Sequence, residues 1–300
     1  MVNEIKMSEQ AVLVTVKMTK FANRITDKVT AGEISEQKKA RAGSTRVAVD
    51  LTDNAAIKAL QVLYGHINNN IIKLYALPWA KGVHLLPAKL IEDFERDINA
   101  AIAEWNDLVK QVEQTYADSV ERARQPAPVG LGKLFNERWF PSVAEVVSKY
   151  SIDFEYATLS SADHLNDIRV TLPQGQIDKM KADLERNLEE AAKNTNIEVH
   201  KRITSALDSL IDGLKRHGTK AKGAKRASKF TDNTVVKLNE LADVAKKLNV
   251  TGDARLDNAI NEIKKDLTDL RPDELRESKT KRKDVAKKAK KIVDDLDGLF

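Results

Sequence analysis

The sequence predicts an α+β protein dominated by helices. We expect a small, mainly antiparallel sheet, a long antiparallel coiled-coil-like helical pair and a C-terminal helical segment. Composition is the first reason, because the 300 residues are 42% hydrophobic and 32% charged but only 5% aromatic, which is typical of helix-rich proteins. Periodicity is the second, because two long stretches, 88–124 and 174–216, carry apolar residues at steps of about three and four. Alternation of apolar and polar residues in several short stretches is the third.

Short alternating stretches predict the strands of one small sheet. Ile152, Phe154 and Tyr156 show the period of two most clearly, and Val47 and Val49 repeat it earlier in the chain. The predicted strands are 11–20, 45–52, 82–86, 151–159 and 167–172.

Capping residues and prolines set the ends of the predicted helices. Pro78 ends a helix over 54–75, and Pro87 suits the first turn of the long helix that follows. Thr231 and Asp253 begin two of the C-terminal helices with the residue types that cap helices. The shorter helices are expected at about 27–41, 54–75, 232–248 and 253–270, with a last one up to about 296.

The apolar stripes of the two long helices are interpreted as intramolecular core, with self-association or a partner's helix as the alternative. The largest aromatic side chains are expected to anchor this core: Trp79, Trp105, Trp139 and Phe140. The expected organisation is an α+β body with a helical arm over 1–217, a flexible basic linker over 218–229 and a helical segment over 230–300.

Positive charge is concentrated in two segments near the C-terminal end. Each carries a formal charge of +7, although the whole chain carries only +5, so the remaining residues are acidic overall. The first segment holds Lys215, Arg216, Lys220, Lys222, Lys225, Arg226 and Lys229. The second holds Lys279, Lys281, Arg282, Lys283, Lys287, Lys288, Lys290 and Lys291, opposed by Asp284.

No residue pattern points to catalysis, a metal or a cofactor. The chain has no cysteine, and its five histidines lack the spacing of a metal-binding helix. The stretch GTKAKGAK at 218–225 resembles a phosphate loop, but Ala224 stands in place of the lysine and Lys225 in place of the hydroxyl residue. We therefore expect a non-enzymatic protein that needs no cofactor. A hydrolase with unrecognised carboxylates stays as a third possibility.

Nucleic-acid binding is the alternative function. Two basic segments supply non-specific affinity, because lysine and arginine neutralise phosphates and release counterions. Against this, neither segment contains the aromatic side chains that stack on unpaired bases, apart from Phe230 at the edge of the first. A solvated helix face explains the second segment equally well. No stretch reaches the length of a membrane span or a signal sequence, so a cytoplasmic protein is expected.

Four stretches together resemble a family of phage and bacterial proteins of unknown function. They are LVTVKMTKF, PWAKGVHLLPAKLIEDFERDINAAIAEW, LFNERWFPSVAEVVSKYSIDFEYATL followed by DIRVTLP, and FTDNTVVKLNELADVAKKLNVTGDARLDNAINEI. Members of that family are often encoded near a MoxR-type AAA ATPase and a von Willebrand A-domain protein. The resemblance implies a phage-encoded accessory protein in the host cytoplasm. It would act as adaptor or substrate of an ATPase-driven system. DNA or RNA is instead the partner that the two basic segments would bind in the alternative function. None of the four stretches is a catalytic signature, so the resemblance transfers no functional residue.

Overall fold

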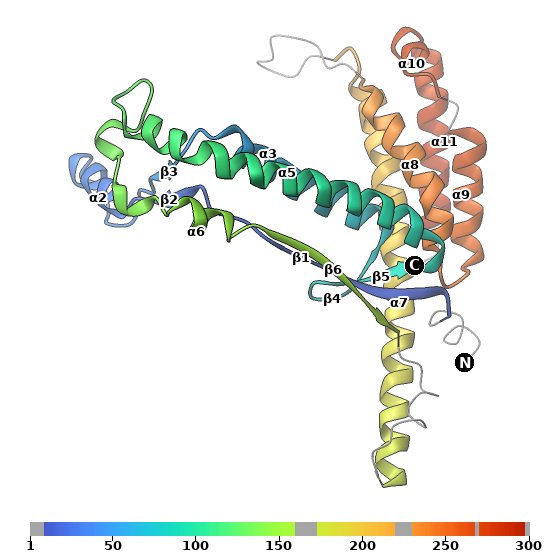
Figure 1. The fold of residues 1–300 in the computed structure, drawn as a ribbon. Helices are drawn as coiled ribbons and strands as arrows, with labels where there is room; N and C mark the ends of the chain where they lie inside the picture. The colour runs from blue at the N-terminus through green and yellow to red at the C-terminus, as the bar shows by residue number, and fades with distance from the viewer. Residues whose placement is uncertain (1–8, 160–172, 220–229, 268–269, 298–300) are drawn as a thin grey trace. The chain divides into compact units, whose positions relative to one another are not determined.

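The computed structural model describes residues 9–159, 173–219, 230–267 and 270–297 (Figure 1). It has the predicted helix-dominated α+β fold. The chain divides into two compact units built from separated segments. The first unit takes Met1–Thr15, Ile72–Phe94 and Glu155–Phe300, and the second takes Val16–Ile71 and Glu95–Phe154.

Within the described residues, the main sheet has four strands in the order β4-β5-β1-β6. Strand β1 (Ala11–Thr19) pairs antiparallel with β5 (Val83–Pro87), with Leu13 opposite Leu85. Strand β5 forms an antiparallel hairpin with β4 (Leu77–Ala80), and β6 (Ser151–Thr158) is the other edge strand. The strands predicted over 11–20, 82–86 and 151–159 are confirmed, whereas β4 was not predicted, because Pro78 reads as a helix stop.

In the part of the chain that the structure describes, a second sheet consists of β2 (Arg24–Thr26) and β3 (Ala48–Asp50), paired antiparallel with Ile25 opposite Val49. The prediction that 45–52 joins the main sheet is therefore wrong. Three residues of this stretch pair with β2, and the Leu51 amide then donates to the Asn23 carbonyl. The strand predicted over 167–172 lies outside the described residues.

The helices of the first unit pack as a bundle on α7 (Gln174–Arg216), which begins and ends where the sequence predicts (Figure 1). Helix α7 packs along α8 and α11, and α9 packs against both of these. The stripe of α7 is buried at Val199, Ile203, Leu207, Leu210 and Leu214. The sequence predicts that this helix pairs with the long helix over 88–124. Within this unit, its helical partners are α8, α9 and α11. The other helices of the bundle are α8 (Asp232–Leu248), α9 (Ala254–Asp266), α10 (Pro272–Glu277) and α11 (Lys279–Asp297).

The remaining helices precede α7 in the chain. Helix α5 (Ile91–Arg124) follows a 3-10 turn at Ala88–Leu90, as Pro87 predicts. The helix predicted over 54–75 is α3 (Ala55–His66), a π-helical segment at Ile67–Ile72 and α4 (Lys73–Tyr75). The remaining short elements are α2 (Lys28–Gln37), α6 (Val143–Val147) and 3-10 turns at Gly132–Leu134 and Glu137–Trp139.

Buried aromatic side chains of α5 form the core of the second unit. Trp105 is 1% exposed and makes an edge-to-face contact with Tyr150, with ring centroids 6.0 Å apart. Tyr116, also 1% exposed, makes the same kind of contact with Phe21 at 6.2 Å. Such pairs contribute about 1 kcal/mol beyond the burial of their area. Trp105 is thus the core anchor that the sequence predicts.

Trp79, Trp139 and Phe140 correct the rest of that prediction. All three keep part of their surface in contact with solvent, so they are not fully buried core residues. Trp139 ends a 3-10 turn and Phe140 follows it directly, in irregular backbone. Two large aromatic groups are therefore left at the surface, close together.

Candidate functional site

The basic residues of α11 are largely paired with neighbouring acidic groups. Lys281 contacts Glu274 of α10 at 2.7 Å, and Lys288 contacts Asp266 of α9 at 2.7 Å. Their hydrogen bond lowers the pKa of the Asp266 carboxyl below its ordinary value. Lys290 contacts Asp294 at 2.6 Å within its own helix. These contacts offset much of the positive charge on this face.

The two other engaged bases of α11 also have local roles. Arg282 donates to the carbonyls of Leu275 and Arg276 at 2.8 and 3.0 Å and so caps the end of α10. Lys291 lies 3.7 Å from Glu262 and 3.6 Å from Asp295. By contrast, Lys283 and Lys287 have no ion pair with any residue that the structure describes. The predicted second basic segment is therefore mostly an ion-paired helix surface.

The first basic segment is described only at its start. Arg216 pairs with Asp212 at 3.0 Å, and Lys215 has no ion pair within the described ranges. The remaining predicted residues of this segment lie outside the described residues: Lys220, Lys222, Lys225, Arg226 and Lys229.

Phe230 joins the ends of the chain on either side of that undescribed stretch. Its amide donates to Nδ1 of His217 at 3.0 Å, and its carbonyl accepts from Nε of Arg276 at 3.1 Å. The Phe230 ring is 2% exposed and lies on Gly213, where an added Cβ atom would be 3.2 Å from the ring. Arg276 also pairs with Asp232 at the start of α8. The contacts of Phe230 with His217 and Gly213 therefore hold the two sides of the undescribed stretch next to each other.

A buried arginine ties α7 to the end of the α3–α4 helix. Arg202 donates from Nε to the Glu198 carboxylate at 3.0 Å, and its other two nitrogens donate to the carbonyls of Lys73 and Ala76 at a helix C-terminus. Burial lowers the pKa of Arg202, and burial together with its charge lowers the pKa of His84. The cluster satisfies backbone carbonyls of the chain itself, so we interpret it as structural.

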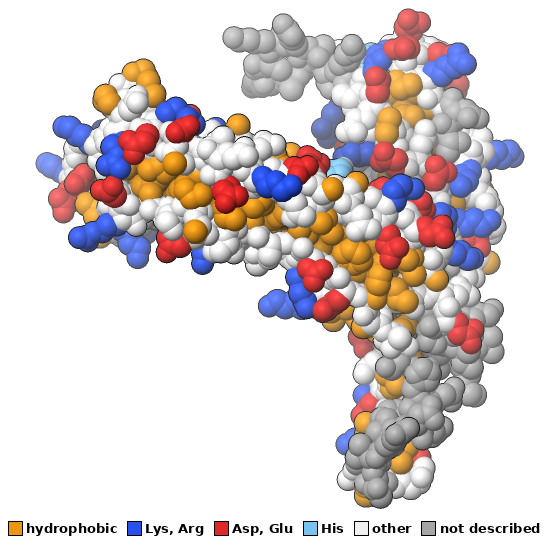
Figure 2. Space-filling view, in the orientation of Figure 1, with side chains coloured by type: hydrophobic (Ala, Val, Ile, Leu, Met, Phe, Trp, Pro, Cys, Tyr) orange, Lys and Arg blue, Asp and Glu red, His pale blue; other side chains and the backbone are white. Residues whose placement is uncertain are grey.

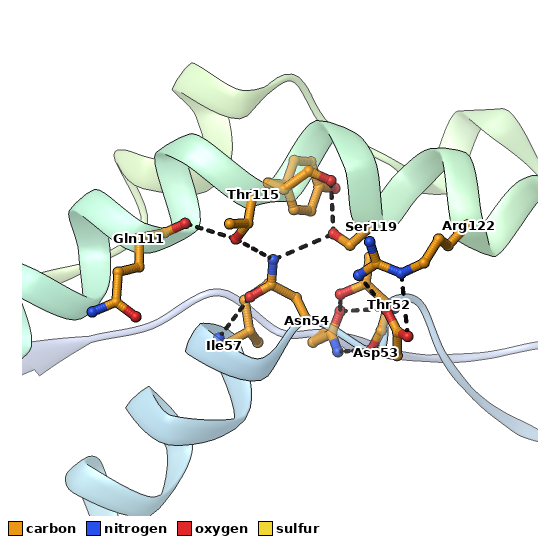
Figure 3. A network of polar contacts seen from close by, with 10 residues as sticks. Thr52, Asp53, Asn54, Ile57, Gln111, Thr115, Ser119 and Arg122 are labelled. Atoms are coloured by element: carbon orange, nitrogen blue, oxygen red, sulfur yellow. Dashed lines mark hydrogen bonds and ion pairs between the residues drawn. The ribbon is translucent and has the colours of Figure 1, made fainter.

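Polar contacts fix the start of α3 to the end of α5 (Figure 3). Asn54 caps α3 by accepting from the Ile57 amide at 3.1 Å, and its amide group donates to Thr115 of α5 at 2.9 Å. Arg122 of α5 donates to Asp53 at 2.9 Å, and this hydrogen bond lowers the pKa of the Asp53 carboxyl. The last turn of α5 is therefore held rigidly within its unit.

The chain that leaves α5 folds back over the last carbonyls of the helix. The Leu131 amide donates to the Ala123 carbonyl at 2.8 Å, and the Gly132 amide donates to the Gln125 carbonyl at 3.1 Å. Gly130 passes so close to the helix end that a Cβ atom there would lie 2.2 Å from the Gln125 oxygen. This close wrap positions the residues that follow.

An aromatic surface follows this wrap; we define it as Val129, Leu134, Phe135, Trp139 and Phe140. Val129 is 60% exposed and Leu134 is 36% exposed. The rings of Phe135 and Phe140 are stacked, with centroids 4.8 Å apart. All three aromatic side chains are partly exposed, and hydrophobic groups are visible on the loop after α5 in Figure 2.

Arginine and lysine side chains border the aromatic surface. Arg124 lies over the Phe135 ring, 4.9 Å from its centroid, and pairs with Glu137 at 3.0 Å. Lys133 and Arg138 have no ion pair with the part of the chain that the structure describes. The border of the surface therefore carries two uncompensated positive charges.

The fold and these surfaces define a helix-dominated α+β protein without a recognisable catalytic centre in its described residues. In the same ranges, no three acidic or histidine side chains gather in a way that could hold a metal ion. No helix among them combines the length and apolar character needed to cross a bilayer. No protein-family model, curated protein or solved structure matches this chain.

Sequence reasoning did not identify the aromatic surface. The signal was present in LGKLFNERWF, where five bulky apolar residues lie among basic residues within ten positions. This stretch has neither helical nor strand periodicity, and such aperiodic clusters are more often exposed than a periodic stripe. The feature that could have identified this surface is therefore the lack of a regular face on which these side chains could be buried.

Proposed function

We propose that the chain is a non-enzymatic accessory or adaptor protein that binds a protein partner through the aromatic surface. The observation that supports this most is the partial exposure of Phe135, Trp139 and Phe140 in one short segment. Aromatic and arginine side chains are enriched at protein interfaces, where a few of them provide most of the binding energy.

The rigidity of the surface supports the same proposal. Phe135 lies between Phe140 and the guanidinium of Arg124, so its conformation is already restricted before a partner arrives. The wrap around the end of α5 restricts the backbone as well. A surface that is ordered in advance loses less conformational entropy on association, which favours tighter binding.

The charges at the border indicate the chemistry of the partner. Lys133 and Arg138 are both exposed and uncompensated within the described residues, so a partner with an apolar pocket and neighbouring carboxylates is complementary. The resemblance to the phage family supports a MoxR-type AAA ATPase or a von Willebrand A-domain protein as that partner, in the cytoplasm of a host cell. Any ATP chemistry would then belong to the partner.

Affinity capture from cells that express candidate partners tests the proposal. Tagged wild-type protein is compared with Trp139→Ser, which removes the exposed aromatic group, and with Val62→Ser as the control. Val62 is a good control because it is 73% exposed on α3 and lies outside the aromatic surface. We expect an ATPase or A-domain protein to be captured by the wild type and by the control, and to be lost from Trp139→Ser.

Equal capture of the same proteins by all three baits would contradict the proposal. Circular dichroism of each purified bait separates lost binding from lost folding. Both substituted side chains are at least partly exposed, so large destabilisation is not expected.

Nucleic-acid binding is the second candidate function. It is favoured by the uncompensated Lys215, Lys283 and Lys287 and by the contact at Phe230 that holds the ends of the first basic segment together. A salt titration of binding to DNA and RNA measures how many phosphates the protein contacts. The logarithm of the binding constant falls linearly with the logarithm of the salt concentration, with a slope of about −0.9 for each phosphate contacted. We expect Lys283→Ala with Lys287→Ala to reduce this slope, and Lys288→Ala, whose lysine is already paired, to leave it almost unchanged.

A further inference from the structure

A pocket of about 520 Å³ lies beside α2 in the second unit. It is lined by one face of α2, by the end of β2 and by the chain that leads into β3. Lys28, Ala31 and Gly32 share the helix face, since residues three and four apart are neighbours on a helix. The other lining residues are Thr26, Gly43, Thr45 and Arg46. The size is that of a site for a small organic ligand.

The polar side chains that line this pocket are hydrogen-bond donors that have no partner among the described residues. Lys28 and Arg46 form no ion pair, and the hydroxyls of Thr26 and Thr45 form no hydrogen bond, with any residue that the structure describes. No aspartate or glutamate is among the lining residues. Arg24 on the neighbouring strand shows the contrast, because Asp50 binds its guanidinium through two hydrogen bonds of 2.6 and 3.0 Å.

Asp27, which lies between Thr26 and Lys28 in the chain, is already engaged in hydrogen bonds. Asp27 caps α2, and its carboxylate accepts from the amides of Val29 and Thr30 at 3.0 and 3.1 Å and from the Thr30 hydroxyl. These hydrogen bonds lower the pKa of Asp27 and turn its charge toward the helix. Lys28 directly after the cap opposes the usual preference for acidic side chains in the first turn, so helix stability does not explain it.

Gly32 keeps the pocket open. A Cβ atom added at this position would meet no atom within 4 Å, so packing does not require glycine here. Glycine inside a helix costs about 1 kcal/mol relative to alanine. Gly43, by contrast, has a φ of 78° that favours glycine for backbone reasons. The glycine in the middle of α2 therefore lowers the stability of the helix, and the close approach of a ligand at this position would explain why it is there.

We propose that this pocket binds a small phosphate monoester, with its phosphate between Lys28 and Arg46 and the hydroxyls of Thr26 and Thr45 as further donors. A monoester carries a charge of about −1.5 to −2 at neutral pH, which two cations match. A phosphodiester carries only one negative charge, so the oligonucleotide backbone is the less complementary ligand. The site is independent of the aromatic surface, and the proposed adaptor function does not depend on it.

Amide chemical shifts of Gly32 and Gly43 in NMR spectra report binding directly. The probes are adenosine 5′-monophosphate, inorganic phosphate, adenosine and dimethyl phosphate, each added to the full chain. We expect saturable shifts with the monophosphate, weaker binding of inorganic phosphate, and no saturable shift with adenosine or dimethyl phosphate. Lys28→Met and Arg46→Met are each expected to weaken the monophosphate roughly fivefold or more, as the loss of one charge contact implies.

Two further variants separate a built site from general charge attraction. Gly32→Leu fills the pocket while improving helix propensity, so it should fold at least as well as the wild type and lose monophosphate binding. Lys38→Met removes an exposed charge outside the pocket and should leave binding within twofold. The proposal is overturned if the monophosphate gives no saturable shift, if Lys38→Met weakens it as much as Lys28→Met, or if dimethyl phosphate binds equally well.

Discussion

Replacing Gly130 by alanine tests the wrap that positions the aromatic surface. The new Cβ atom would lie 2.2 Å from the carbonyl oxygen of Gln125, 2.5 Å from that of Arg122 and 2.8 Å from that of Ala123. All three are backbone atoms of the α5 end, so no side chain can rotate away. The loop must move by roughly 1 Å to restore van der Waals distances.

The magnitude follows from what this movement disrupts. The two hydrogen bonds from Leu131 and Gly132 to the helix end contribute about 1 kcal/mol each. Crowding in a packed place adds about 1 kcal/mol or more. We therefore expect Gly130→Ala to lower the free energy of unfolding by about 3 kcal/mol.

Gly65→Ala is the matched control for this experiment. Gly65 lies inside α3, and a Cβ atom there meets nothing within 4 Å. The same chemical change should stabilise the protein by about 0.5–1 kcal/mol through helix propensity. Urea unfolding followed by circular dichroism measures both variants. Equal midpoints for Gly130→Ala and wild type, or a loss of similar size in Gly65→Ala, would refute the reasoning.

Three other predictions concern buried groups. Burial raises the pKa values of Tyr116 and Tyr150 to about 12, so between pH 10 and 12 the unfolded chain releases phenolic protons that the native state keeps. Stability should therefore fall as pH rises through this window, by at most about 3 kcal/mol for each group, and phenolate absorbance with urea unfolding at each pH measures it. Arg202→Met should lower the free energy of unfolding by about 3 kcal/mol, because the Glu198 carboxylate and two backbone carbonyls lose their hydrogen-bond donor. Adding Glu198→Leu should recover part of this loss, and a double-mutant cycle measures the coupling. Phe230→Ala should cost about 3–5 kcal/mol, measured by urea unfolding, because it empties a fully buried site; a loss below 1 kcal/mol would contradict the contact described there.

Helix starts were predicted well where local chemistry determines them, whereas α2 and α9 end about four residues earlier than expected. Asp253 caps α9 as expected, by accepting from the Arg255 amide. Thr231 stands at the N-cap of α8 as expected, although its side chain makes no capping hydrogen bond. These features depend on residues within one turn, so one sequence suffices to predict them.

Features that depend on distant residues could not be predicted. The π-helical segment at Ile67–Ile72 has the same apolar spacing as an α-helix, so periodicity does not distinguish the two. Strand β4 depends on its partner β5, since Pro78 alone indicates a helix stop. The covering of the α7 stripe by α8 and α11 is likewise a property of tertiary packing, because any amphipathic helix of the chain offers a matching face.

The charges of the candidate sites show the same limit. Sequence locates Lys281 and Lys288 within a basic segment, but their partners Glu274 and Asp266 lie on other helices. Net charge per segment therefore overstated the free positive charge on α11. Conversely, Trp139 was assigned to the core because large aromatic residues are usually buried, whereas its irregular backbone leaves it partly exposed.

Photo-crosslinking at the aromatic surface tests the central claim most directly. Benzoylphenylalanine replaces Trp139 in one sample and the exposed Val62 of the same unit in another, and both are irradiated in cells that hold candidate partners. The proposed function predicts one discrete protein partner joined to position 139 and absent from position 62. No crosslink at position 139, or the same products at both positions, would contradict it.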